Sequence, residues 1–228
     1  MKRVNYVSLG DSIATGTITP FSNIRSFVYY LHERFGEADV YNLARNGDTA
    51  GDLLCKIDNS CRFRRAIENA DFITVSIGGN DLMKAASLPG FVRIDEHRAS
   101  YGVKSFAANW PLIIDEIRSI NRGAEIVVLN LFNPYNRSEY LERRYCGDNG
   151  LYETADKFIA QINGVIKAYS ANKYEIADVY SEFERFSKGD MDRVSCLYQC
   201  SMMQMLRNPH PTPEGQRIIA DAVIKCRG

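Results

Sequence analysis

The sequence lacks an excess of charge of either sign. Its 28 lysines and arginines balance 28 aspartates and glutamates, so the formal net charge is zero. Nothing in this balance indicates nucleic acid or an anionic membrane as the main partner.

An apolar run long enough to cross a bilayer is also missing, so no membrane-spanning helix is predicted. The basic start at residues 1–3 is like that of a signal peptide, but polar residues soon interrupt the apolar stretch that follows. We expect a cytoplasmic protein or a secreted protein in its mature form.

Metal-ligand spacings are absent too. Neither His32 nor His97 has a cysteine or histidine at the spacing of a metal site, and the sequence has no Cys-x-x-Cys pair. The even number of cysteines permits disulfides in an exported protein, and reduced structural cysteines fit equally well. Both possibilities stay open for the six, which stand at positions 55, 61, 146, 196, 200 and 226.

Internal repeats, low-complexity tracts and linkers are missing as well. The 228 residues, 45% of them hydrophobic, are enough for one α/β domain with a substantial core, which we predict over residues 1–228. β-favouring runs alternate with helical patterns, and this alternation predicts a three-layer α/β/α sandwich on a five-stranded parallel sheet. The expected strands cover residues 4–9, 39–43, 71–77, 125–131 and 174–179.

Helices are predicted from apolar periodicity and from their end signals. Ser22 would cap the first, Thr49 or Asp48 the second, and Thr212 the last, which has Pro213 at its first position. Irregular connections, which could form the rim of a site, are expected over 82–104, 132–150 and 180–206. The helices are expected over 23–35, in a short stretch after residue 49, and over 62–69, 105–121, 151–171 and 213–225.

Three predicted strands end in turns that are rich in small polar residues. Ser12 follows the first strand in Gly10-Asp11-Ser12, Gly47 follows the second, and Asn80 follows the third in a Gly-Gly-Asn-Asp turn. Carboxyl ends of parallel strands share one sheet edge, where such folds bind ligands. His210 stands between two prolines just before the last helix, which makes it the best-placed catalytic histidine. Taken singly, each of these turns could equally be an ordinary helix cap or loop.

In this order, Ser12, Gly47, Asn80 and His210 resemble the four blocks of the SGNH (GDSL) hydrolase family. The resemblance implies a flavodoxin-like fold with strand order 2-1-3-4-5, and ester hydrolysis without metal or cofactor. It also implies that Ser12 is the nucleophile and His210 its base. The N–H groups of Ser12 and Gly47 and the side-chain amide of Asn80 would then bind the oxyanion.

One position departs from the family pattern. The family usually has an aspartate three residues before the histidine, and here Arg207 stands there. Asn208 or a backbone carbonyl could orient His210, or an acid such as Asp190 or Asp192 could reach it, or catalysis could be impaired. We favour the first, a working dyad. Asp11 is interpreted as a structural residue of the turn.

The leading functional hypothesis is a serine esterase that acts on a small or medium acyl ester. An acetylated carbohydrate, a lysophospholipid and a thioester are all candidate substrates. The alternative is a catalytically impaired ligand-binding protein of the same fold, and the missing aspartate motivates it. The sequence predicts no oligomeric state.

Overall fold

A computed structural model describes residues 3–19, 22–86, 93–136, 150–197 and 209–227. Its centre is a parallel five-stranded sheet with the order β4-β1-β5-β6-β7. Counted along these five strands, the order is 2-1-3-4-5, so the predicted fold class and strand order are confirmed. The strands are β1 (Val4–Gly10), β4 (Ala38–Asn42), β5 (Phe72–Ser76), β6 (Glu125–Leu129) and β7 (Glu175–Ala177).

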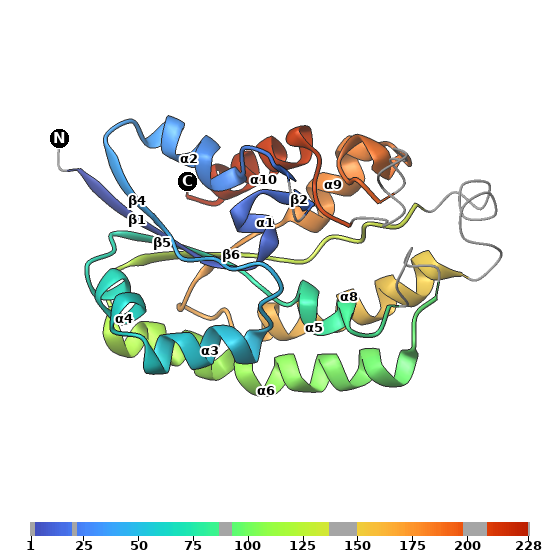
Figure 1. The fold of residues 1–228 in the computed structure, drawn as a ribbon, viewed down its shortest axis with the longest axis horizontal. Coiled ribbons are helices and arrows are strands. Elements are labelled where there is room, and N and C mark those ends of the chain that lie inside the picture. The colour runs from blue at the N-terminus through green and yellow to red at the C-terminus, as the bar shows by residue number, and fades with distance from the viewer. Residues whose placement is uncertain (1–2, 20–21, 87–92, 137–149, 198–208, 228) are drawn as a thin grey trace.

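Helices cover both faces of the sheet (Figure 1). One face carries α1 (Ser12–Thr15), α2 (Phe27–Phe35), α9 (Val179–Ser187) and α10 (Pro213–Cys226). The other carries α3 (Ala50–Asn59), α4 (Cys61–Glu68), α5 (Gly79–Met83), α6 (Glu96–Ile120) and α8 (Leu151–Ala168). Each face has its own apolar cluster, and every residue of β5 is buried between them. Burial on both faces explains the high share of apolar residues in this strand.

The strand register brings three strand ends to one edge. Ser8 of β1 lies opposite Asn42 of β4, and Gly10 lies opposite Ser76 of β5. Gly10 has a φ of +142°, and a Cβ there would lie 2.1 Å from the Ser76 carbonyl oxygen. Only glycine fits this combination of backbone angle and close approach. The first strand can therefore turn sharply at the point where the polar turns meet.

The first predicted helix begins later than expected. It was placed at residues 23–35 with Ser22 as its cap, but α2 starts at Phe27 and Ser26 is the N-cap residue. Residues Ser22–Asn23 form β3, which pairs antiparallel with β2 (Thr17–Thr19). Ile24 also donates its N–H to the Gly16 carbonyl at 2.8 Å. These pairings commit the segment to a hairpin, so it cannot begin a helix.

Two segments that were predicted to be irregular contain helices. In the range 82–104, α6 begins at Glu96, because the Asp95 carboxylate accepts hydrogen bonds from the next N–H groups and caps the helix. In the range 180–206, most of α9 and a 3₁₀ helix at Met191–Arg193 are present. Residues 137–149 lie outside the described part.

Gly102 lets α6 pack against α5, and its replacement tests this contact. A Cβ at Gly102 would lie 2.1 Å from the Asp81 carbonyl oxygen. We expect Gly102→Ala to lower the free energy of unfolding by about 1–3 kcal/mol, because backbone atoms must move apart. Gly164→Ala in α8 is the control: nothing lies within 4 Å of its added Cβ, and it should stabilise by about 0.5–1 kcal/mol. Urea denaturation measures the free energy of unfolding of both variants. Equal values for the two variants would contradict a close contact between Gly102 and the Asp81 carbonyl.

Candidate active site

Ser12 is the first residue of a four-residue helix at the end of β1. The Asp11 carboxylate caps this helix by accepting a hydrogen bond from the Ile13 N–H at 3.0 Å. Gly16, with a φ of +74°, ends the helix after one turn. Ser12 is 8% exposed, so its hydroxyl lies at the edge of the packed structure.

His210 lies beside Ser12, as its Nε2 atom is 2.6 Å from the Ser12 Oγ. The segment that carries His210 pairs antiparallel with residues 194–196. Cys196 donates its N–H to the His210 carbonyl at 2.8 Å, and Thr212 donates its N–H to the Val194 carbonyl at 2.9 Å. Thr212 also caps α10, as predicted. The histidine is therefore fixed by a backbone bridge in addition to the flanking prolines.

Burial lowers the pKa of His210 to about 4. An imidazole with this pKa is neutral at pH 7, so one ring nitrogen carries a lone pair. The Ser12 hydroxyl can donate its hydrogen to an unprotonated Nε2 at this distance. The pair therefore has the protonation state and the geometry that a hydroxyl nucleophile and its base require.

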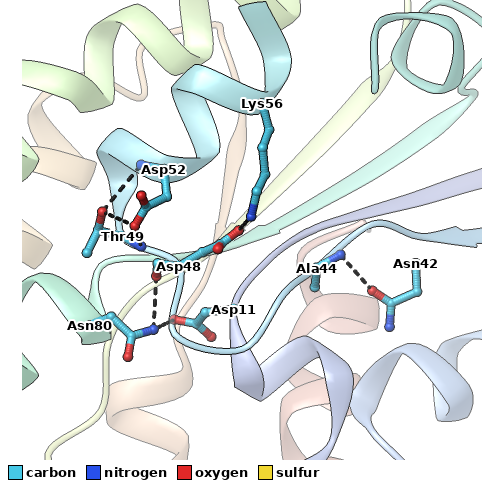
Figure 2. Close-up of polar contacts among 8 residues, drawn as sticks. All are labelled: Asp11, Asn42, Ala44, Asp48, Thr49, Asp52, Lys56 and Asn80. Carbon is cyan, nitrogen blue, oxygen red and sulfur yellow. Dashed lines mark hydrogen bonds and ion pairs between the residues drawn. The ribbon is translucent and has the colours of Figure 1, made fainter. Parts of the chain in front are cut away.

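Gly47 and Asn80 belong to the turns after β4 and β5. Gly47 has a φ of +81°, and its side-chain position faces open space. The Asn80 Nδ2 donates to the Asp48 carbonyl at 2.9 Å and contacts the Asp11 Oδ2 at 3.4 Å (Figure 2). These contacts place the Asn80 amide between the Ser12 turn and the loop that contains Gly47.

Two buried carboxyl groups support these turns. Asp81 accepts a hydrogen bond from the Ala50 N–H at 3.0 Å and so holds the start of α3. Asp11 holds the start of α1 in the same way. Burial raises the pKa of Asp11 to about 7 and that of Asp81 to about 6. Nearby, Asp48 forms an ion pair with Lys56 (Figure 2).

Asp190, one of the acids considered as partners of His210, has other contacts. Asp190 caps the 3₁₀ helix, where it accepts from the Asp192 N–H at 3.2 Å, and it lies 3.9 Å from the Arg193 guanidinium. The structure does not bring Asp190 to the imidazole. The charge of Asp192 contributes to raising the pKa of Cys196. Asn208 and Arg207 lie outside the described residues, so the group that orients His210 stays a prediction.

Gln216 connects the two halves of the site and was not predicted. Its side chain is 1% exposed. The Oε1 accepts from the Phe27 N–H at 2.8 Å, and the Nε2 donates to the Ile13 carbonyl at 3.0 Å. Gln216 therefore joins α10, which follows His210, to the helix of Ser12. In the sequence, Gln216 differs from its surroundings only as a single polar residue on the apolar face of the last predicted helix.

A mainly apolar cavity of about 140 Å³ opens beside Ser12 and His210. It extends between α5, α6 and α8. Asn80 lies at its polar end. The apolar part of its wall includes Leu82, Met83, Ala86, Ile94, Ala99, Leu131, Phe132, Ala155, Phe158 and Ile159.

The four described cysteines are free thiols: Cys55, Cys61, Cys196 and Cys226. No disulfide therefore joins any two of these four. Cys146 and Cys200 lie outside the described residues. Within the described ranges, no helix combines the length and apolar character that a membrane span requires.

Comparison with known proteins identifies the family. The model of the GDSL-like lipase/acylhydrolase family matches residues 8–218, a range that includes Ser12, Gly47, Asn80 and His210. The chain therefore belongs to this family, as the motif resemblance predicted.

The chain is also similar to individual proteins. The uncharacterized protein YpmR of Bacillus subtilis (strain 168) is 33% identical over 137 residues, which are 56% of this chain and 51% of YpmR. The match thus spans about half the length of that curated relative. The lipase Lip_vut3 from a goat rumen metagenome has a TM-score of 0.73 at 22% identity, covering 98% of this chain and 97% of its own. The extracellular lipase of Streptomyces rimosus has a TM-score of 0.75 at 18% identity, covering 98% and 100%. These structures share the fold.

The lowered pKa of His210 can be measured by NMR. We expect its ring protons to titrate near pH 4, below the ordinary value of 6.5, because burial disfavours the imidazolium. The unfolded chain then binds more protons than the folded chain between these two values. The contribution of His210 to stability is therefore complete above about pH 6.5 and is lost as the pH falls toward 4. With three histidines in the chain, His210→Gln assigns the signal. A midpoint near 6.5 would show a solvated imidazole.

Proposed function

We propose that the protein is a serine esterase in which Ser12 is the nucleophile and His210 the general base. The observation that carries this proposal is the 2.6 Å contact between the Ser12 Oγ and the His210 Nε2 at the mouth of an apolar cavity. A hydroxyl is a weak nucleophile until a base takes its proton, and a neutral imidazole is suited to this task. Membership of the GDSL-like lipase/acylhydrolase family supports the same reaction class.

In the proposed reaction, the Ser12 Oγ attacks the ester carbonyl carbon while its proton moves to the His210 Nε2. The carbonyl oxygen gains a negative charge and is bound by the N–H groups of Ser12 and Gly47 and by the Asn80 amide. One such donor typically contributes about 3 kcal/mol to the transition state. His210 then gives its proton to the leaving alcohol. A water molecule, activated by the same base, releases the acid from the acyl-enzyme.

We propose that His210 works in a dyad and that Asn208 or a backbone carbonyl orients it. Arg207 occupies the position at which the family usually has an aspartate. The contacts of Asp190 within its own turn speak against that residue. The antiparallel bridge to residues 194–196 supplies much of the positioning that a carboxylate would otherwise provide. The stabilising effect of a negative charge on the imidazolium would be absent from such a dyad.

The cavity supports an ester with an apolar acyl group of small to medium length. Its wall beyond Asn80 is mostly aliphatic and aromatic, which suits a hydrocarbon chain better than a sugar. A cavity of similar size in another protein binds benzene, so about 140 Å³ accommodates roughly six carbons. The two structural relatives described above are both named lipases. An acetylated carbohydrate would leave most of this cavity unfilled.

Hydrolysis of p-nitrophenyl esters from acetate to decanoate tests the mechanism. We expect Ser12→Ala and His210→Ala to lower kcat by at least about 1,000-fold, because they remove the nucleophile and its base. Asn80→Ala should lower kcat by roughly 100-fold through loss of one oxyanion donor. Asn208→Ala should lower kcat less than His210→Ala does. An equal loss of kcat in the two variants would show that His210 cannot act without Asn208.

A fluorophosphonate probe separates this function from the alternative of a binding protein. The probe should label the wild type and leave Ser12→Ala unlabelled, because only an activated serine reacts. If wild-type turnover does not exceed that of Ser12→Ala at any chain length and the probe does not react, the esterase proposal is wrong.

The cavity wall predicts how acyl-chain preference can be changed. Ala155 of α8 lines the cavity and is 8% exposed. Ala155→Phe should lower kcat/KM for the octanoate ester at least about tenfold relative to acetate, because the ring fills the space for the chain. Ala160→Phe, on the exposed side of the same helix, is the matched control. An unchanged ratio of octanoate to acetate in the Ala155 variant would show that acyl chains bind elsewhere.

A further inference from the structure

Asp11 occupies a position that its capping role does not fully explain. It precedes Ser12 in the chain, and it is 3% exposed. Its Oδ1 accepts the hydrogen bond that caps α1, from the Ile13 N–H at 3.0 Å. Its other oxygen, Oδ2, lies 3.4 Å from the Asn80 Nδ2 (Figure 2). One carboxyl group thus contacts both the nucleophile turn and the proposed oxyanion donor.

The contact between Asp11 and Asn80 affects the direction in which the Asn80 amide hydrogens point. An amide nitrogen carries two hydrogens, and the Asp48 carbonyl accepts one of them at 2.9 Å. The Asp11 Oδ2 is the second acceptor of this NH₂ group, so an oxyanion would share the remaining hydrogen with it. At 3.4 Å this contact is long. A carboxylate there fixes the plane of the amide while leaving the hydrogen able to bond a substrate oxygen.

We propose that Asp11 is a positioning residue for Asn80: its ionised carboxylate holds the side-chain amide in the orientation that oxyanion binding requires, and protonation weakens that hold. The proposal rests on the proposed esterase function. It assigns to Asp11 a role in the chemistry beyond that of a turn residue, and it makes the reaction sensitive to pH through a group other than the histidine.

The charges around Asp11 place its titration near neutral pH. Asp81 of α5 and Asp48 of the loop before α3 both face it, and both add negative charge. Two cations act on these neighbours: Lys56 forms an ion pair with Asp48, and the charge of Lys84 lowers the pKa of Asp81. Burial and these two neighbours raise the pKa of Asp11 to about 7. Part of the Asp11 population is therefore protonated at pH 7 and below.

His210 does not titrate in the same range. Its pKa of about 4 keeps it neutral from pH 5 upward. A loss of kcat as the pH falls from 9 to 5 would therefore follow the protonation of Asp11 or of Asp81, whose pKa is about 6, and the variants below separate the two. The expected sign is that kcat rises with pH through about 7.

Asp11→Asn separates the two functions of the side chain. The amide oxygen of the variant can still cap the Ile13 N–H, so α1 keeps its N-cap. Its NH₂ group would then face the Asn80 NH₂ group, and two donors cannot bond each other. Asp81→Asn is the matched control, because Asp81 is the other buried carboxyl group that caps a helix here, and its bond goes to the Ala50 N–H.

The first experiment measures kcat and KM for a p-nitrophenyl ester between pH 5 and 9. In Asp11→Asn we expect kcat at pH 8 to fall at least about tenfold, KM to stay within about twofold, and the step near pH 7 to disappear. Asp81→Asn should keep the step, moved to lower pH because a neighbouring negative charge is gone. If Asp11→Asn keeps both the wild-type kcat and the step, the proposal is wrong.

The second experiment needs no turnover. In ¹⁵N-labelled protein, the side-chain NH₂ signals of Asn80, assigned with Asn80→Ala, should shift with a midpoint near pH 7 in the wild type and at lower pH in Asp81→Asn. They should be independent of pH in Asp11→Asn. Signals that do not titrate in the wild type overturn the role of Asp11, even if the protein is an active esterase. Titrating signals in a protein without esterase activity support the role of Asp11 and overturn only the proposed function.

Discussion

The contact between Ser12 and His210 joins two residues that are 198 positions apart, and the rest of the site depends on it. A single hydrogen bond contributes only about 0.5–1.5 kcal/mol, so it cannot draw the two ends of the chain together. The fold must place both residues beforehand. Gly10 ends β1 where its backbone can approach β5 closely, and the bridge at Ser195 and Pro211 holds the other end. Gln216 then fixes the distance between the two elements.

Local sequence signals predicted the elements that bring polar turns to the sheet edge. Parallel strands end at one edge, so the order of β-favouring runs was enough to place Ser12, Gly47 and Asn80 near one another. The cap of α10 was equally local, since Thr212 and Pro213 are adjacent. The strand order followed from the family resemblance, and the register of β1 with its two neighbours agrees with it.

Apart from the local β2–β3 hairpin, in which Thr17 pairs with Asn23, the features that the sequence did not reveal depend on contacts between distant segments. Gln216 has no sequence signal for its two backbone partners, which lie 189 and 203 residues away. The antiparallel bridge beside His210 likewise pairs two loops. Each of these contacts is set by tertiary packing, which single-residue propensities do not encode.

Helix α5, which has five residues, contributes to both the polar and the apolar part of the candidate site. Asn80 and Asp81 stand in its first turn, and Leu82 and Met83 line the cavity immediately afterwards. Gly102 fixes this short helix against α6, because the Asp81 carbonyl lies where a side chain would otherwise be. An acyl chain that fills the cavity would press on the same helix that presents the amide. In the proposed mechanism, where Asn80 binds the oxyanion, the fit of an apolar chain would therefore affect kcat as well as KM.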